Sequence, residues 1–230
     1  MLTKTEGIVL RCYRYKDNHF LAHILTRESG IVTYAVYAPE SKRSRTKMSY
    51  FQPLTLLEID ADHKSNRTIQ TIKELHPLSI SVNIISNPYK TAIALFVAEV
   101  INACVPPENP DAELYHTIRN VVKSIDSDTP VDSHFALKFL LTLSDYLGFN
   151  PTHDEERLVI NEFLGSSDIS SEERILFTRF IEAYNNGNVN VFRHEERQNI
   201  LRTMLRYFKF NLPDMPQIHS SEVLAAVFEG

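Results

Sequence analysis

The chain has 230 residues and a formal net charge of −5, with 43% hydrophobic and 23% charged residues. These values are those of an ordinary soluble protein that is long enough for one large core or two smaller ones. No apolar run is long enough to cross a bilayer, and the first residues, MLTKTEGIVLR, lack a signal-peptide pattern. We therefore expect a cytoplasmic protein without a membrane partner, in which Cys12 and Cys104 are buried free thiols.

Charge is distributed unevenly along the chain. Residues 1–78 contain twelve Lys or Arg and eight Asp or Glu, whereas residues 79–230 contain twelve and twenty-one. A basic first part on an acidic body suggests that an anionic partner meets the first part. The alternative interpretation is that small barrels are often mildly basic.

The first part of the chain is typical of short strands separated by turn residues. Apolar and β-branched residues fill the strand positions, and Gly30 can supply a positive φ in one of the turns. Five such strands, taken as antiparallel, suit a small closed barrel of the size of an OB-fold. The expected strands are residues 5–13, 20–26, 31–38, 54–61 and 67–75.

The connection between the third and fourth strands differs from the others. Aromatic residues follow it at Tyr50 and Phe51, and cations for phosphates beside rings for bases are what binding of single-stranded nucleic acid needs. The alternative is a solvated hairpin loop without a partner. The connection contains four cations with no acidic residue between them. They are Lys42, Arg43, Arg45 and Lys47.

Other barrel residues are weaker candidates for the same surface. Arg14 is expected on the face of the basic connection, whereas Arg11 points outward to a surface that the sequence leaves undecided. Aromatic residues in strands pack in cores more often than they stack on bases. Tyr50 is the best candidate for stacking because it adjoins the basic connection. The others are Tyr13, Tyr15, Tyr34, Tyr37 and Phe51.

Helical periodicity follows Pro77. Asn87 before Pro88 and Asp111 predict helix starts, and Gly148 predicts a helix end. Ser170 and Glu173 form a capping box for a helix that runs through residue 184. Two more helices are expected, over about residues 193–210 and after residue 220. We therefore predict an α+β protein with an OB-fold-like five-stranded barrel over residues 1–78, followed by a helical domain over residues 79–230 in which the segment 149–170 is irregular.

Several segments also carry a family resemblance. In the barrel they are EGIVLRCYRYKDN, LTRESGIV, the basic connection and FQPLTLLEI, and in the helical part FALKFLLTLSDYLGFNP and RTMLRYFKFNLPDMPQIHSSEVLAAVF. In this order and spacing they resemble the RecO family of bacterial recombination and repair mediators. The resemblance implies a protein without catalytic activity or cofactor that binds single- and double-stranded DNA and anneals complementary strands. It also implies cooperation with RecR, and through it help in loading RecA onto strands coated with single-strand-binding protein.

The region after the Leu-Gly-aromatic-x-Pro motif departs from the family pattern. Many RecO proteins carry four zinc-binding cysteines there, whereas this chain has Thr152, His153, Asp154 and Glu155 after Pro151 and no cysteine in the region. A structural zinc needs four nitrogen or sulfur ligands held close together. We therefore predict that the protein binds no metal.

The third predicted helix contains a candidate partner site, Lys138 followed by Phe139. RecO proteins often have Arg before an aromatic residue at this place, where it lines a site for the acidic, Phe-terminated tail of single-strand-binding protein. A cation beside an apolar groove suits a carboxylate attached to a hydrophobic side chain. The alternative is a surface lysine whose stem covers apolar neighbours.

No catalytic motif is found in the sequence. It has no Gly-rich phosphate loop, no HExxH and no GxSxG, and its nine histidines lack ligand spacing. Two other hypotheses stay open. One is a different OB-fold module that binds RNA or serves translation, which a comparison of DNA and RNA affinity would separate. The other is a hydrolase whose carboxylates cluster only in the folded protein.

Overall fold

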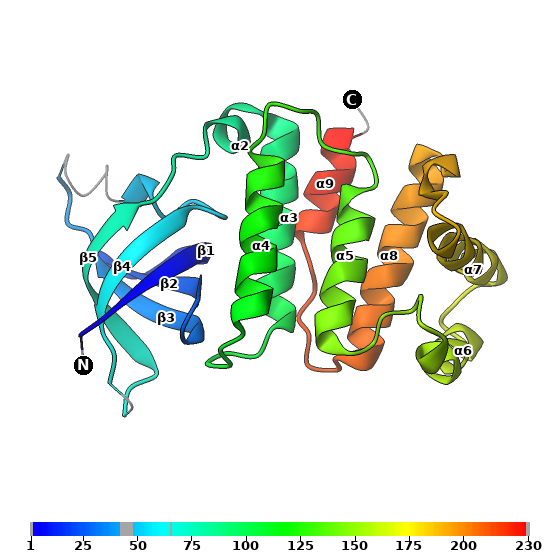
Figure 1. The fold of residues 1–230 in the computed structure, drawn as a ribbon, viewed down its shortest axis with the longest axis horizontal. Helices are drawn as coiled ribbons and strands as arrows, with labels where there is room; N and C mark the ends of the chain where they lie inside the picture. Colours follow the sequence, from blue (N-terminus) through cyan, green and yellow to red (C-terminus); the bar gives the residue numbers. More distant parts are fainter. Residues whose placement is uncertain (1, 42–47, 65, 229–230) are drawn as a thin grey trace. The chain divides into compact units, whose positions relative to one another are not determined.

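The chain begins with a closed five-stranded barrel. The computed structural model describes residues 2–41, 48–64 and 66–228 (Figure 1). Around the barrel the strands follow the order β1-β2-β3-β5-β4. Their bounds are Leu2–Lys16, His19–Thr26, Gly30–Tyr37, Leu56–Asp62 and Ile69–Pro77 for β1 to β5. The predicted five-stranded barrel is therefore confirmed.

The strand directions differ from the prediction at one pair. β1 pairs with β2 and β4, β2 with β3, and β4 with β5, all antiparallel, but β3 and β5 run parallel. A closed ring with an odd number of strands cannot alternate direction all the way round. At least one parallel pair is therefore required, and the prediction of a purely antiparallel barrel is wrong.

The alternation of side chains fills the barrel. Val32, Tyr34 and Val36 of β3 point inward and are buried, whereas Tyr37 at the strand end is exposed. At the other end of β3, Gly30 has a φ of +67°, and a Cβ there would lie 2.5 Å from the backbone oxygen of Asn109. Glycine is required at this position both by the backbone conformation and by the close approach of that neighbouring chain segment.

Helices make up most of the remaining chain. The described ones are α2 Val82–Ser86, α3 Pro88–Cys104, α4 Ala112–Ile125, α5 Phe135–Leu147, α6 Arg157–Gly165, α7 Ser171–Asn185, α8 His194–Asn211 and α9 Ser220–Phe228. None of these described helices is both long and apolar enough to cross a membrane.

The predicted helix ends are confirmed. The side chains of Asn87 and Asp111 accept hydrogen bonds from the first turns of α3 and α4, and Gly148 ends α5 in the left-handed conformation. Ser170 and Glu173 form the expected capping box of α7. These local signals therefore fix where the helices begin and end.

Two helices were not expected from the sequence. α2 is a single turn, and α6 lies inside the segment 149–170 that is predicted to be irregular. That prediction is wrong for residues 157–165, where Ile160, Phe163 and Leu164 are buried on one side of α6. The neighbouring Pro151 and acidic residues obscure this short pattern in the sequence.

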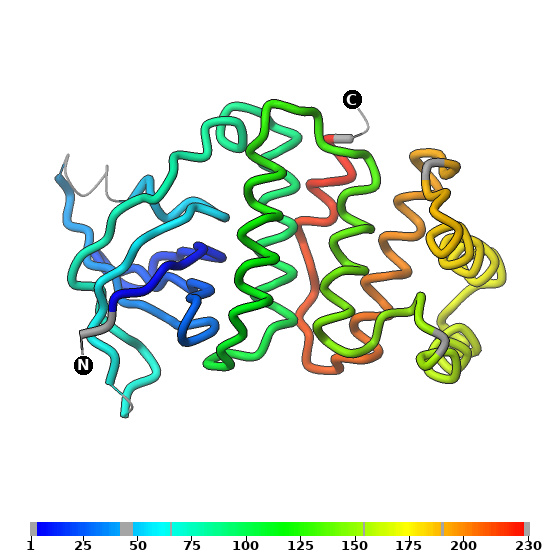
Figure 2. The backbone as a smooth tube through the Cα atoms, in the orientation of Figure 1, coloured from blue at the N-terminus to red at the C-terminus, as the bar shows by residue number. Residues whose placement is uncertain are grey.

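The chain forms two compact units. The first contains residues 1–130 and 219–230, and the second contains residues 131–218. Figure 2 traces how α9 returns to the first unit, where it packs against α3. The Glu99 carboxylate of α3 accepts hydrogen bonds from the backbone N–H groups of His219 and Ser220, at 3.1 and 2.8 Å. The predicted domain boundary near residue 78 stays a prediction.

Both cysteines are free thiols. Cys104 is buried as expected, whereas Cys12 is only half-buried. Burial raises the pKa of Cys12 to about 11 and that of Cys104 to about 12. Neither thiol is therefore a reactive thiolate at neutral pH.

Candidate nucleic-acid interface

The turn between β1 and β2 gathers charged and aromatic residues at one end of the barrel. Lys16 pairs with His19 across this turn, and His19 pairs with Tyr37 at the end of β3. The rings of His19 and Tyr37 lie 5.1 Å apart. Strand pairing therefore brings together residues that are up to 21 positions apart in the sequence.

Three exposed cations lie on the second half of β1, namely Arg11, Arg14 and Lys16, which we call the β1 cations. Arg11 lies over the ring of Tyr13 at 4.8 Å, and the Lys16 ammonium lies 5.5 Å from the ring of Tyr15. Arg14 donates to the backbone oxygen of Asp17 at 2.7 Å. None of the β1 cations forms an ion pair with a carboxylate of the described residues. Rings and a carbonyl orient these cations but leave their charge uncompensated.

The structure separates the candidate stacking residues into two groups. Tyr15 and Tyr37 are each 59% exposed, so their ring faces are accessible to a base. Tyr34 is fully buried, and its hydroxyl lies 2.8 Å from Nε2 of His63. Phe51 is also buried, and Tyr50 is half-buried against the barrel core.

Tyr13 is held in a further set of contacts. It is half-buried, with its ring edge against His23, and His23 in turn lies 2.8 Å from the side-chain oxygen of Asn102 on α3.

Burial raises the pKa of Tyr34, which stays a neutral core residue. Tyr15 and Tyr37 are therefore the most exposed of the six aromatic candidates, and the stacking role of Tyr50 stays a prediction.

The basic connection leaves the barrel beside the same turn. The backbone N–H of Ala38 donates to the oxygen of Asn18 at 2.9 Å, and the side chain of Met48 packs against the barrel core on the return. The four predicted cations, Lys42, Arg43, Arg45 and Lys47, lie outside the described residues. Their connection nevertheless starts next to the row formed by Lys16, His19 and Tyr37.

The loop between β4 and β5 carries two further cations that sequence reasoning did not select, Lys64 and Arg67, of which Lys64 already pairs with Asp62 at 3.7 Å. The side chain of Gln70 holds this loop by accepting from the Lys64 N–H at 2.9 Å and donating to the Arg67 oxygen at 2.7 Å. β5 begins beside Thr33, so the loop lies toward the start of β3. In OB-folds, oligonucleotides bind across β2 and β3 between this loop and the β1–β2 loop, a relation that could have identified both residues.

The predicted partner site lies on α5 in the second unit. The Lys138 ammonium is paired with the carboxylate of Asp132, which also accepts from the His134 N–H at 2.9 Å. Burial alone would raise the pKa of Asp132, but these two partners outweigh it and lower the pKa to about 2. Phe139 is 4% exposed. A carboxylate from a partner would therefore compete with Asp132 for Lys138, and the role of this site stays a prediction.

Metal ligands do not gather in the described part of the chain. Its residues contain no group of three or more His, Cys, Asp or Glu side chains that could hold a metal ion. In the segment that departs from the family pattern, His153 lies 3.3 Å from Asp145, and these two residues belong to no such group. The absence of a bound metal stays a prediction.

The fold and the interface define a class of protein. It is an OB-like five-stranded barrel that carries cations without carboxylate partners among the described residues and two exposed rings, joined to helices. Comparison with known proteins then gives the family. Residues 1–80 match the model of the recombination protein O N terminal and residues 85–210 that of the recombination protein O C terminal.

Full-length relatives agree with this match. The chain is 30% identical to the DNA repair protein RecO of Bacteroides fragilis over 242 residues, which cover 100% of both chains. It is 29% identical to the DNA repair protein RecO of Azobacteroides pseudotrichonymphae over 241 residues, again with 100% of both chains covered. The chain therefore belongs to the RecO family, a family of non-enzymatic recombination mediators in DNA repair.

Proposed function

We propose that the protein binds single- and double-stranded DNA at the end of the barrel formed by the β1 cations, Tyr15, Tyr37 and the basic connection. The observation that carries this proposal is the hydrogen bond from Ala38 to Asn18, which starts the basic connection beside the β1–β2 turn. The connection that carries the other four cations therefore starts beside the turn that ends β1. Phosphates bind the cations and unstacked bases bind the rings.

Annealing of complementary strands follows from the same chemistry. Contacts to phosphates and ring faces are independent of sequence, so two different strands bind equally well. Neutralised phosphates repel each other less, which favours pairing of the bound strands. The net charge of −5 does not oppose this, because charges farther apart than about 8 Å are largely screened at physiological salt.

The experiment that tests the proposal replaces Lys42, Arg43, Arg45 and Lys47 together by Ala. The affinity of the intact protein for a single-stranded oligonucleotide is measured over a range of salt concentrations by fluorescence anisotropy. If each cation contacts one phosphate, the slope of log K against log salt falls by roughly 0.7 per lost contact, about 3 in all. An unchanged slope contradicts the proposal. The same titration with RNA of matched sequence tests the alternative of an RNA-binding module.

We infer the partners from the family. The protein would cooperate with RecR in the bacterial cytoplasm and, through it, help to load RecA onto strands coated with single-strand-binding protein. Lys138 would bind the carboxylate of that protein's acidic tail in exchange for Asp132, with apolar contact close to Phe139. This inference rests on the family resemblance and on the position of Lys138 at the surface of α5.

The partner site is tested by Lys138→Glu. We expect this change to weaken binding of a peptide with an acidic stretch and a terminal Phe at least several-fold, because attraction becomes repulsion, and to leave DNA affinity nearly unchanged. Lys123→Glu, at an exposed lysine of α4, is the matched control. If Lys138→Glu and Lys123→Glu have equal effects on the peptide, Lys138 is only a surface lysine.

A further inference from the structure

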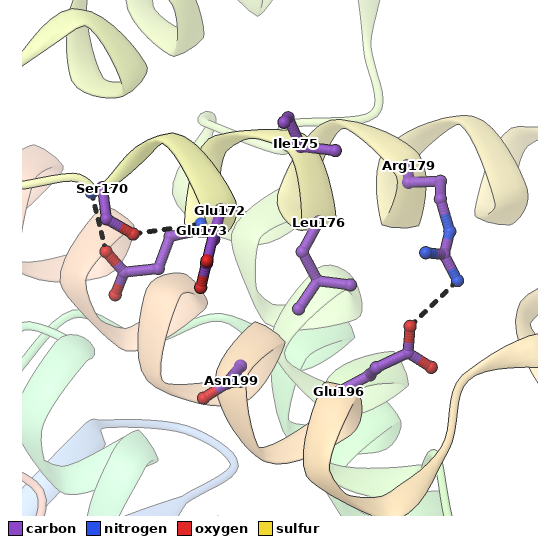
Figure 3. A pocket seen from close by; sticks show the side chains of 8 residues that line it. All are labelled: Ser170, Glu172, Glu173, Ile175, Leu176, Arg179, Glu196 and Asn199. Carbon is purple, nitrogen blue, oxygen red and sulfur yellow. Dashed lines mark hydrogen bonds and ion pairs between the residues drawn. The ribbon is translucent and has the colours of Figure 1, made fainter.

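A groove lies between α7 and α8 in the second unit, and none of its lining residues is assigned above to DNA or partner binding. Its volume is about 410 Å³. Figure 3 shows the side chains that line it, with Leu176 of α7 pointing toward α8. The lining residues are Ser170, Glu172, Glu173, Ile175, Leu176, Arg179, Glu196 and Asn199.

Ion pairs between the two helices stand at both ends of the groove. Arg179 pairs with Glu196 at 3.1 Å, and Glu173 pairs with Arg206 at 2.8 Å. Glu173 and Arg179 are six residues apart on one helix, which corresponds to about 9 Å of helix rise. The groove is therefore long enough for one or two side chains from a partner.

The centre of the groove is apolar. Glu172, Ile175, Leu176 and Arg179 have the spacing of one helix face, and Ile175 is 68% exposed although the opposite side of α7 already buries Phe177 in the core. A single exposed isoleucine is normal on a protein surface. Here, however, Ile175 borders a groove that has Leu176 at its base. An apolar side chain of a partner that enters this groove would therefore be shielded from water on two sides.

The charges of the lining residues determine which kind of partner segment the groove favours. Three of the lining residues are glutamates and one is an arginine. Glu173 and Glu196 already have arginine partners, whereas Glu172 forms no ion pair with any residue that the structure describes. An uncompensated carboxylate beside an apolar floor attracts a cation attached to an apolar segment and repels the phosphates of DNA.

We propose that this groove docks an amphipathic helix of a partner protein. The helix places one apolar side chain over Leu176 and Ile175 and directs a Lys or Arg from the next turn toward Glu172. This is the helix-in-groove mode of recognition, with a basic rather than an acidic partner segment. The groove is thereby distinct from a site for an acidic tail at Lys138.

The test uses the intact protein and two fluorescein-labelled helical peptides that carry the same leucine stripe. One peptide bears lysines beside the stripe and the other bears glutamates at the same positions. We expect the lysine peptide to bind at least tenfold more tightly in a fluorescence-anisotropy titration. Glu172→Lys and Ile175→Ser each weaken its binding at least fivefold, and neither change alters the affinity for an oligonucleotide.

Matched controls separate the groove from general surface effects. Glu162→Lys and Leu158→Ser change an exposed glutamate and an 82% exposed leucine of α6, both outside the groove, and we expect them to change the affinity less than twofold. Equal binding of the two peptides, or equal effects of groove and control variants, would overturn the proposal. Sedimentation that shows a dimer which Ile175→Ser converts to a monomer would assign the groove to a second copy of the chain instead.

Discussion

The β1 cations of the barrel and three cations of the second unit are similar in kind but have different partners. Lys138, Arg179 and Arg206 each pair with a carboxylate, at Asp132, Glu196 and Glu173 respectively. The β1 cations lie against rings and a backbone oxygen instead. An exposed cation therefore does not by itself identify an anion-binding surface, since the positions of the nearby carboxylates decide which cations stay available for phosphate.

Of the changes that compare these two regions, removal of the β1 cations is expected to have the largest effect, and removal of the three cations of the second unit is its matched control. Replacing Arg11, Arg14 and Lys16 by Ala lowers the salt slope of single-stranded DNA affinity by about 2, at roughly 0.7 per phosphate contact. Replacing Lys138, Arg179 and Arg206 by Ala removes the same charge but leaves the slope within about 0.5, because these cations already have carboxylate partners. Equal slopes for the two variants would remove the distinction between the two regions.

A smaller effect is expected at the exposed rings. Tyr15→Leu and Tyr37→Leu each weaken single-stranded DNA binding by roughly 1 kcal/mol, about fivefold, without changing the salt slope, because a lost ring removes stacking and no charge. Anisotropy titrations at two salt concentrations measure both quantities. Tyr34→Phe is the control: it removes the hydroxyl next to His63 and lowers the free energy of unfolding by about 1 kcal/mol, with DNA affinity unchanged. A loss of DNA affinity in Tyr34→Phe alone would place the stacking surface elsewhere.

The free energy of unfolding is expected to differ between the two regions in the opposite sense to DNA binding. Arg206 pairs with Glu173 and also donates to the backbone oxygen of Asp168, so Arg206→Ala is expected to lower the free energy of unfolding by about 1 kcal/mol. Arg14→Ala removes an exposed cation bonded only to a backbone oxygen and is expected to change it by less than about 0.5 kcal/mol. Urea unfolding followed by circular dichroism measures both. A larger loss in Arg14→Ala would mean that the barrel cation serves the fold.

The last prediction concerns how the contribution of Asp132 to stability depends on pH. The pKa of Asp132 is lowered to about 2 in the folded protein from an ordinary value near 3.8, so its carboxylate contributes stability above pH 4 that is lost as the pH falls through 2. We expect Asp132→Asn to melt at a lower temperature than the unchanged protein at pH 6, and the difference to disappear near pH 2. A difference that stays constant over this range would show that Lys138 and His134 do not stabilise the charged form.

Local signals in the sequence predict much of this fold. Asn87, Asp111 and Gly148 act at the helix ends where their side chains or backbone conformations satisfy the terminal groups. Alternation predicts the strands, and the parity of Val32, Tyr34 and Val36 could also have predicted that Tyr34 is buried. Short elements escape such signals, since α2 is one turn long and α6 begins directly after an acidic segment without a side-chain cap.

The candidate site is less predictable because it depends on pairing between distant residues. Lys16 and Tyr37 are brought close together because both are strand partners of His19, and the sequence does not show the register of these strands. The pairing of Lys138 with Asp132 depends in the same way on the turn that precedes α5, where Asp132 also accepts from His134. Composition shows how many cations the chain has, whereas their partners follow from the folded geometry.

Lysine modification tests most directly which cations meet DNA. The intact protein is acetylated briefly with and without saturating single-stranded oligothymidylate, and the modification of each lysine is quantified by mass spectrometry. We expect DNA to protect Lys16, Lys42 and Lys47, whereas Lys123 and Lys138 are modified to the same extent in both samples. Protection of Lys138 with unchanged modification of Lys16 would contradict this expectation.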